Sequence, residues 1–291
     1  MKTTRSRFAG IIGALAIALA LAGCSAIKLG YNTLPDLAYW WLDGYVDFTD
    51  AQTPQVRTEL ARLHAWHRQE ELPRLAEILG RMEQLAGGSI KAPQACAFVT
   101  EIQGRLNLVA ERAEPAVSAL AAGLDARQLR HLERKYRNNN ETFRKDWVEL
   151  PPAELRDKRF QQAVERAEMI YGNLEEPQRA VLRQGIDQSI FDAARMLGER
   201  QRRQQDLLQT LRRIQEAPGA PEDGAAAIRA YLQRAQRSPD PAFRRLQEDL
   251  VQETCRTFAA VHESTTPAQR DQAVRRLRAY QRDLRELAAR R

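Results

Sequence analysis

The sequence predicts an all-α protein, an elongated bundle of long antiparallel amphipathic helices. Ala, Leu, Arg, Gln and Glu, all of which favour helices, dominate the 291 residues. No convincing run of alternating β-branched residues indicates a strand. Prolines and glycines divide the chain into long stretches whose apolar residues recur every three or four positions, which is the spacing of one face of a helix.

The N-terminal residues indicate a signal peptide. The first ten residues carry three basic side chains and no acidic one, the apolar run 11–21 follows, and small residues precede Cys24. These features are typical of a secretory signal rather than a transmembrane helix. Removal of residues 1–23 takes away three positive charges and lowers the net charge from +7 to +4. This mild surplus fits adhesion to anionic lipid head groups and does not indicate nucleic-acid binding.

Cys24 follows Leu-Ala-Gly and resembles the cysteine of the bacterial lipobox. The resemblance implies cleavage before Cys24 and attachment of diacylglycerol to its sulfur, so the membrane is one predicted partner. In lipoproteins an Asp after this cysteine marks retention in the inner membrane. Ser25 stands there instead, and the resemblance therefore implies an outer-membrane anchor with the body facing the periplasm.

Residues 24–48 form the predicted membrane-proximal segment, and residues 49–291 form a single helical domain. The segment holds six of the 19 aromatic residues in the chain: Tyr31, Tyr39, Trp40, Trp41, Tyr45 and Phe48. Two interpretations stay open for these rings. They pack beneath the bundle as ordinary core, which we favour, or they lie at the membrane interface with their polar edges in water.

The positions of the prolines and glycines, together with the apolar spacing between them, predict the helices in order. They cover residues 35–46, 50–70, 74–86, 93–112, 125–149, 153–172, 175–216, 223–236, 240–262 and 267–289. At 1.5 Å per residue, the helix over 175–216 is about 60 Å long. Its apolar stripe is interrupted between Arg200 and Gln205, so we expect that part to overhang into solvent or to face a cleft.

Four of the predicted helices begin with the same capping pattern. A capping residue is followed three positions later by glutamine: Thr49 with Gln52, Asp125 with Gln128, Glu175 with Gln178, and Thr266 with Gln269. In such a box the two residues exchange side-chain and backbone hydrogen bonds. The pattern resembles the LTxxQ signature of small periplasmic chaperones and stress-response regulators of the Spy and CpxP type. The resemblance implies a surface for protein clients. Four ordinary helix starts are the alternative, since capping boxes are common.

A second resemblance extends over nearly the whole chain. It rests on the lipobox and on five short segments: Tyr31-Asn32-x-Leu34-Pro35, Tyr39-Trp40-Trp41-Leu42-Asp43, Trp66-His67-Arg68, Glu71-Leu72-Pro73 and His262-x-Ser264-Thr265-Thr266-Pro267-x-Gln269-Arg270. Together they resemble an uncharacterised family of Gram-negative lipoproteins, known only as a domain of unknown function. This resemblance supports the lipoprotein assignment and implies no activity.

Cys96 and Cys255 are the only cysteines after Cys24. An exported protein meets an oxidising compartment, so the even count predicts a disulfide between them. Two separate buried thiols are the alternative. The disulfide closes a loop of about 160 residues, which the chain-entropy model values at about 4–5 kcal/mol, and it joins an early helix to a late one.

The sequence shows no arrangement that points to catalysis. His64 and His67, with Glu70 and Glu71 after them, are compatible with a zinc site; a surface or core-edge pair is the alternative that we favour. His131 and His262 are expected to be structural. Phosphate-binding glycine loops, nucleophile elbows and Cys/His pairs are missing from the chain. We predict no catalytic residues, no metal and no cofactor.

Three arginine runs remain, at residues 200–203, 212–213 and 275–276. We expect solvated helix faces, with contact to lipid phosphates or to an acidic partner as the alternative. Taken together, the features predict a non-enzymatic lipoprotein that binds protein clients or envelope components. A scaffold or assembly factor of an envelope complex is the second hypothesis, and an enzyme of the cell wall or of lipids is the third.

Overall fold

A computed structural model describes residues 27–216 and 221–290 of the chain. The all-α prediction is confirmed: the described residues form helices and connecting turns and contain no strand. The predicted signal peptide and Cys24 lie outside the described residues. Among those residues, no helix is both long enough and apolar enough to cross a bilayer.

The helices follow one another with short connections. A helical stretch over 27–32 precedes them. The structure has α2 (Leu34–Val46), α3 (Thr53–Trp66), the π-helical turn η1 (His67–Glu71), α4 (Leu72–Ala86), α5 (Ala92–Ala122), α6 (Ala126–Phe143), the π-helical turn η2 (Arg144–Val148), α7 (Pro152–Tyr171), α8 (Glu176–Asp187), α9 (Ala193–Glu216), α10 (Pro221–Gln236), α11 (Pro241–Glu263) and α12 (Pro267–Ala289).

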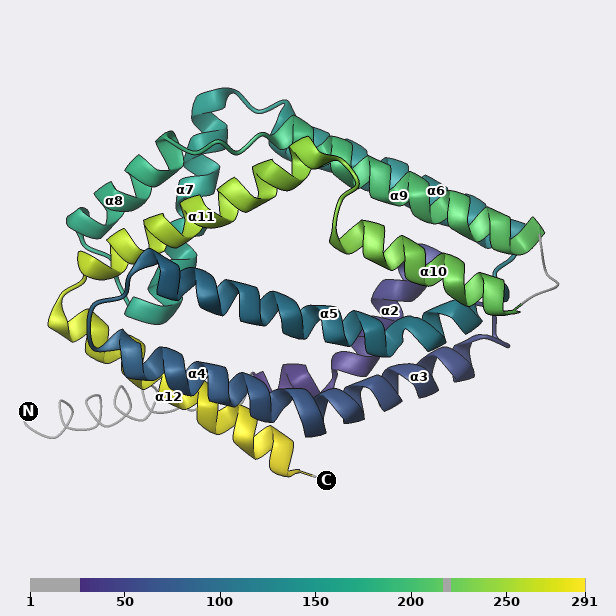
Figure 1. Ribbon diagram of the computed structural model, residues 1–291, viewed down its shortest axis with the longest axis horizontal. Helices are drawn as coiled ribbons and strands as arrows, with labels where there is room; N and C mark the ends of the chain where they lie inside the picture. Colours follow the sequence, from purple (N-terminus) through teal and green to yellow (C-terminus); the bar gives the residue numbers. More distant parts are fainter. Residues whose placement is uncertain (1–26, 217–220, 291) are drawn as a thin grey trace, which may run out of the picture.

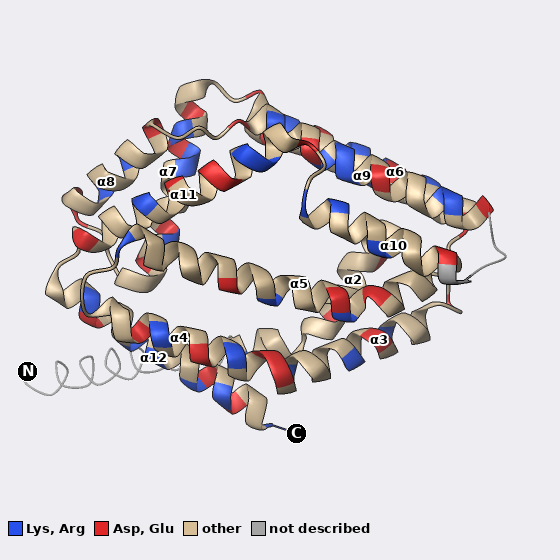
Figure 2. Cartoon of the chain, viewed as in Figure 1, with Lys and Arg blue, Asp and Glu red and all other residues tan. Residues whose placement is uncertain are grey.

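These helices make an elongated frame (Figure 1). Helices α6 and α9 lie side by side along one long edge, and α4 packs along α12 on the other. Helices α7, α8 and α11 close one end, while α5 runs lengthwise between the edges and contacts α10 and α11. Helix α2 crosses behind α5 and contacts both α3 and α6. Basic and acidic side chains are interspersed along most of these helices (Figure 2), whereas α2 carries two aspartates and no basic residue.

Two core clusters, one near each end of the frame, hold the helices together. The first joins α4, α7, α8, α11 and α12 through Ala86, Phe160, Val164, Tyr171, Leu174, Leu182, Val261, Ala273 and Leu277. The second joins α5, α6, α9 and α10 through Ala121, Leu129, Leu132, Leu208, Leu211 and Ile228. Apolar residues spaced along one face of these helices therefore form the two clusters, as expected of packed amphipathic helices.

The predicted disulfide is present. Cys96 of α5 and Cys255 of α11 are bonded, with their Cα atoms 5.5 Å apart and 159 positions apart in sequence. Ile90 and Ala95 pack against Cys255 in a small cluster of their own. The bond therefore joins the lengthwise helix of the frame to one of the helices that close its end.

The predicted separation of helices 50–70 and 74–86 is wrong, because the chain continues from α3 through η1 into α4 without a loop. Pro73 lies at this point, and a proline lacks the amide hydrogen that a helix interior needs. In η1 the Leu72 amide donates to the His67 carbonyl five residues back, and this wider turn accommodates the proline. Helix α5 likewise extends beyond residue 112, and its internal Pro115 is exposed.

The single helix predicted over 175–216 is also wrong, because residues 188–192 separate α8 from α9. Three contacts stabilise this break. The Ile190 amide donates to the Glu253 carboxylate at 3.0 Å, and the Phe191 ring packs edge-on against Trp147. Asp192 then accepts from the Arg195 amide at 3.0 Å, as a capping residue does at a helix start. The apolar spacing continues across the break, so periodicity alone did not show it.

Of the two expectations for residues 200–205, the structure bears out the cleft and not the overhang. Arg200, Arg203 and Gln204 line a pocket of about 290 Å³ that Tyr136 and Tyr231 also line.

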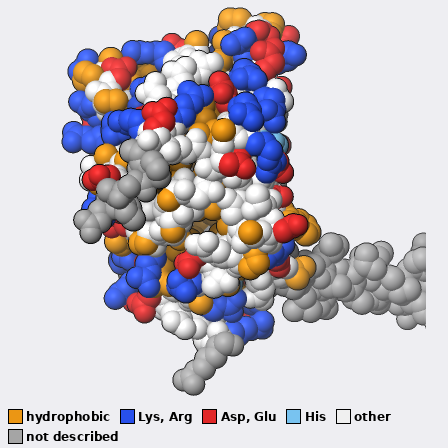
Figure 3. Space-filling view, turned by 90° about the vertical axis from the view of Figure 1, so that its right-hand side faces the viewer, with side chains coloured by type: hydrophobic (Ala, Val, Ile, Leu, Met, Phe, Trp, Pro, Cys, Tyr) orange, Lys and Arg blue, Asp and Glu red, His pale blue; other side chains and the backbone are white. Residues whose placement is uncertain are grey.

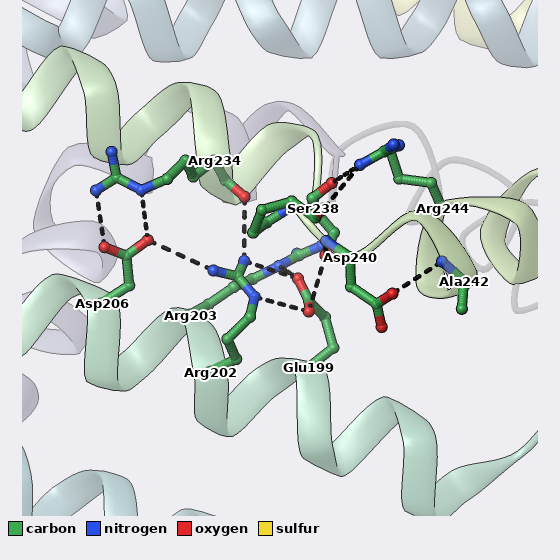
Figure 4. A network of polar contacts seen from close by, with 10 residues as sticks. Glu199, Arg202, Arg203, Asp206, Arg234, Ser238, Asp240, Ala242 and Arg244 are labelled. Carbon is green, nitrogen blue, oxygen red and sulfur yellow. Dashed lines mark hydrogen bonds and ion pairs between the residues drawn. The ribbon is translucent and has the colours of Figure 1, made fainter.

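Two of the basic side chains of this stretch, Arg202 and Arg203, pair with the buried Glu199 (Figure 4). Arg202 and Arg203 each donate to the Glu199 carboxylate at 2.8 Å. Although burial opposes it, these donors lower the pKa of Glu199. Arg234 of α10 pairs with Asp206 at 2.7 Å, so the network joins α9 to α10.

Candidate functional site: an apolar groove at one end of the frame

All four predicted capping boxes form. The backbone amide of each capping residue donates to the glutamine side chain: Thr49 to Gln52 at 3.0 Å, Asp125 to Gln128 at 3.0 Å, Glu175 to Gln178 at 2.9 Å, and Thr266 to Gln269 at 2.9 Å. The capping side chains accept the glutamine backbone amides in return.

The sequence did not show that these boxes lie in pairs. Gln52 and Gln128 bond to each other through their side-chain amides, and Gln269 donates to Gln178 at 3.3 Å. Each amide also donates to the carbonyl two residues before the partner's capping residue: Gln52 to Gly123, Gln128 to Asp47, Gln178 to Ser264, and Gln269 to Asn173. The boxes therefore link one helix start to another. Their glutamine side chains are hydrogen-bonded within the protein.

The histidine pair of the zinc hypothesis holds the N-terminal segment. His64 Nε2 donates to the Tyr31 carbonyl at 2.9 Å, and the Tyr31 hydroxyl bonds His67 Nδ1 at 2.9 Å. Burial lowers the pKa of both histidines. Glu71 bonds Arg105 instead, and the described residues contain no group of side chains suited to a metal.

The two other histidines also have hydrogen-bond partners. His262 is fully buried, with Nε2 2.7 Å from the Gly88 carbonyl and Nδ1 2.9 Å from the Tyr171 hydroxyl. Because a carbonyl can only accept, Nε2 carries the proton and Nδ1 accepts from the tyrosine. His131 Nε2 lies 3.4 Å from the Gly44 carbonyl and links α6 to α2.

The aromatic residues of the N-terminal segment divide between the two interpretations. Tyr31, Tyr39 and Tyr45 face the body, where their hydroxyls bond His67, Thr53 and Asn139. Trp40 and Trp41 do not pack in this way, since they are 66% and 63% exposed. The segment thus contributes both to the packed body and to its surface.

A groove of about 680 Å³ lies between α7, α8 and α11. We call it the α7–α8–α11 groove. Its aromatic lining consists of five residues: Phe143, Trp147, Tyr171, Phe191 and Phe258. The floor is narrow because α8 and α11 approach closely at Gly185, where an added Cβ would lie 2.8 Å from the Thr257 side chain. Apolar and aromatic side chains therefore form a surface that is open to solvent.

Charged side chains stand at the edge of this groove. The Arg159 guanidinium lies 4.4 Å from the Phe191 ring centroid and donates to Ser189 Oγ at 2.8 Å. Burial lowers its pKa. Arg166, also in the lining, is exposed and makes no ion pair with a described residue. Glu253 accepts from the Ile190 amide, so the groove combines an apolar floor with a largely cationic edge.

A second, smaller apolar groove of about 300 Å³ lies between α3 and α5, with Val56, Leu60, Leu63 and Leu120 among its lining residues. Figure 3 shows the end of the frame where α3, α6, α9 and α10 meet. Charged side chains of both signs stand above and below a middle zone of mostly uncharged surface with scattered apolar groups.

The apolar spacing of residues 129–150 explains why the sequence does not reveal the larger groove. Phe143 and Trp147 continue the spacing of the buried Leu129 and Leu132, and this spacing alone would place all four in the core. In the structure the two aromatic residues lie beyond the second core cluster and line the groove. Apolar periodicity identifies the apolar face of a helix, but it does not show which part of that face is buried by neighbouring helices.

The comparisons with known proteins agree with the predicted uncharacterised family. The chain matches the profile of a family of unknown function, DUF6279, over residues 44–221, which is more than half of its length. The matched range runs from the end of α2 to the start of α10. Neither the curated proteins nor the solved structures contain a significant match. The chain therefore belongs to the family of unknown function DUF6279.

Proposed function

We propose that this protein is a non-enzymatic lipoprotein of the outer membrane that binds apolar segments of protein clients in the α7–α8–α11 groove. Cys24 anchors it, and the body faces the periplasm. The groove is the observation that carries the proposal, because its aromatic lining is open to solvent and its volume of about 680 Å³ is large enough for several side chains.

The chemistry of the groove suits unfolded polypeptide. An unfolded client exposes apolar side chains, and burying them gains about 25 cal/mol for each Å² removed from water. Arg159 and Arg166 at the edge favour clients with acidic residues beside the apolar segment. A shallow site of this kind distinguishes polypeptides by apolar character rather than by one exact shape.

The lining also favours binding over catalysis. Its ionisable groups are Arg159, Arg166, Tyr171 and Glu253, without histidine, cysteine or a second carboxylate. General acid–base or nucleophilic catalysis needs a nucleophile and a base within hydrogen-bond reach of each other. The groove does not offer such a pair.

Aggregation of an unfolded model protein tests client binding. The mature chain with Cys24→Ser, which contains every described residue, is mixed with thermally aggregating citrate synthase, without reductant so that the Cys96–Cys255 bond stays intact. We expect it to delay light scattering. Phe258→Ser removes a groove residue that is 40% exposed and should weaken the delay, whereas Leu106→Ser on α5, at a residue 63% exposed outside the groove, should not.

Two results contradict client binding. One is no delay at several-fold excess of the mature chain over citrate synthase. The other is an equal loss of the delay with Phe258→Ser and with Leu106→Ser, which would place the effect outside the groove.

The anchor is tested separately. Cells expressing the full chain are supplied with labelled palmitate, and their inner and outer membranes are separated. We expect label on the wild-type protein in the outer-membrane fraction and none on Cys24→Ser. Labelling of Cys24→Ser, or recovery in the inner membrane, contradicts the anchor or its location.

A scaffold or assembly factor is the second candidate. The disulfide and the paired capping boxes favour it, because they join distant parts of the chain into one rigid frame. Crosslinking in cells separates the two functions. A single stoichiometric partner indicates a scaffold, and many different partners indicate client binding.

A further inference from the structure

The outer face of the N-terminal helices is apolar, and no described part of the chain covers it. Six large apolar residues are exposed there: Ile27 (36%), Leu29 (67%), Leu34 (46%), Leu37 (50%), Trp40 (66%) and Trp41 (63%). Within α2, residues 34, 37 and 41 have the spacing of one helix face, and residue 40 adjoins them. We call Leu34, Leu37, Trp40 and Trp41 the α2 apolar face.

The opposite side of the segment fixes the orientation of this face. The hydroxyl of Tyr39 bonds Thr53 at 2.9 Å, and the hydroxyl of Tyr45 accepts from Asn139 at 2.7 Å. Tyr31 is held by the two histidines of α3 and η1. Because α2 is attached on its inner side, it cannot rotate to bury the tryptophans without breaking these contacts.

The short distance from Cys24 to the first helical residue points to the bilayer as the surface that lies against the α2 apolar face. Ile27 is three positions after Cys24, and a fully extended chain spans at most about 3.6 Å per position, so the reach is about 11 Å. This step rests on the proposed anchor. If Cys24 carries acyl chains in a bilayer, the start of the helical body lies within that distance of the head groups.

The chemistry of the face also fits the bilayer interface. Tryptophan is enriched at the interface, where its ring lies among apolar groups and its N–H stays wet. The Trp41 ring contacts Tyr45, with centroids 4.7 Å apart, and Lys135 Nζ lies 5.6 Å from the Tyr45 centroid. Lys135 makes no ion pair with a described residue, which leaves its charge available to lipid phosphates.

We propose that α2 is a membrane-docking helix, whose apolar face inserts among the lipid head groups beside the Cys24 anchor. The protein then has two contacts with the bilayer, one through acyl chains and one through α2. Two contacts fix its orientation, so that the side of the frame opposite α2, nearest the reader in Figure 1, points away from the membrane.

Vesicle binding without the lipid anchor tests this proposal. The mature chain with Cys24→Ser is mixed with phosphatidylethanolamine–phosphatidylglycerol vesicles, with and without brominated acyl chains. We expect cosedimentation and quenching of tryptophan fluorescence by the brominated lipid. Trp40→Ser with Trp41→Ser should lower partitioning about tenfold or more and abolish quenching, because Trp66 and Trp147 lie elsewhere and are only partly exposed.

Two further variants keep the test decisive. Leu34→Glu with Leu37→Glu alters the same face without removing a fluorophore and should also abolish binding. Leu106→Ser, which changes a residue as exposed as Trp41 on α5, should leave it unchanged. Far-ultraviolet circular dichroism confirms that each variant stays helical.

Three results overturn the proposal: no cosedimentation, equal binding by the Trp40→Ser/Trp41→Ser chain, or a dimer that shields the tryptophans in the absence of lipid. The last result would assign the face to a second copy of the chain. Because no client and no acyl chain is present, failure here is distinguishable from failure of the proposed client binding or of the anchor.

Discussion

Gln52 and Gln128 bond to each other through their side-chain amides. Nε2 of Gln128 donates to Oε1 of Gln52 at 2.8 Å, and the reverse bond is 3.3 Å long. Each residue also completes its own capping box, 76 positions from the other. A second pair, Gln178 with Gln269, makes the same kind of joint at the other end of the frame. The repeated pattern therefore contributes to tertiary structure as well as to helix capping.

Replacing Gln128 should be costly, because the residue is 1% exposed and bonds Asp125, Asp47 and Gln52. For Gln128→Ala we expect a loss of about 2–3 kcal/mol in the free energy of unfolding, since several bonds disappear and buried partners stay unpaired. Gln161→Ala, on an exposed position of α7, is the control and should change it by less than about 0.5 kcal/mol.

A double-mutant cycle isolates the joint itself. Denaturant unfolding of Gln52→Ala, Gln128→Ala and the double variant should give a coupling of about 0.5–1.5 kcal/mol. Strictly additive effects would show that each glutamine serves only its own helix start.

The Cys96–Cys255 disulfide should contribute strongly to stability. Its loop spans 159 positions, and the chain-entropy model then predicts a loss of about 4–5 kcal/mol for the Cys96→Ser/Cys255→Ser variant. Thermal unfolding with and without reductant measures the same effect in the wild type. A thiol assay that finds two free thiols in protein isolated from an oxidising compartment would contradict the bond.

Glu71 and Arg105 form the ion pair whose loss we expect to cost the most. Glu71 is 2% exposed and receives two bonds of 2.7 Å from Arg105, which hold the pKa of its carboxyl below the usual value. Arg105→Ala leaves this charge buried and unpaired and should cost about 3 kcal/mol. Arg81→Ala breaks the exposed pair with Glu101 and should cost less than about 1 kcal/mol. Equal losses in urea unfolding would contradict this difference.

His262 should make stability depend on pH. Burial lowers the pKa of His262 below 6.5 in the folded protein. As the pH falls below 6.5, the unfolded chain therefore takes up the proton first, so the free energy of unfolding decreases until the lowered pKa is reached. This stability is fully present above pH 6.5. Chemical unfolding at about pH 7.5 and about pH 5.5 should show a smaller decrease for His262→Gln than for wild type.

The pKa values of His64 and His67 are also lowered in the folded protein. The free energy of unfolding of the His262→Gln variant should therefore still decrease somewhat as the pH falls. Equal pH dependence in the variant and the wild type would show that protonation of His262 does not affect folding.

Much of the fold could be predicted because it depends on local chemistry. The capping boxes follow from side-chain reach over three residues. The disulfide follows from an even cysteine count in a chain that the sequence predicts to be exported. Two of the wrong helix predictions have a physical origin too. The π-helical turn η1 accommodates Pro73 inside a continuous helix, and the break before α9 depends on Glu253, which is 63 positions away from Ile190.

The candidate site was harder to predict than the fold. The sequence contains the aromatic residues of the groove, yet whether Phe143 and Phe258 are covered depends on where α7, α8 and α11 end and cross. The pairing of the glutamine boxes could not be predicted from the sequence either, because four copies of one motif do not show which copies lie next to each other in the fold. Conversely, of the two interpretations left open for the aromatic rings of residues 24–48, the favoured one, packing in the core, does not hold for Trp40 and Trp41, which are exposed.

Site-specific photocrosslinking in living cells tests the central claim most directly. A photoreactive amino acid replaces Phe258 in the α7–α8–α11 groove or, as the control, Leu106 on α5. Client binding predicts many different crosslinked proteins from position 258, enriched in apolar segments beside acidic residues, and few from position 106. One partner from position 258, or the same products from both positions, would contradict it.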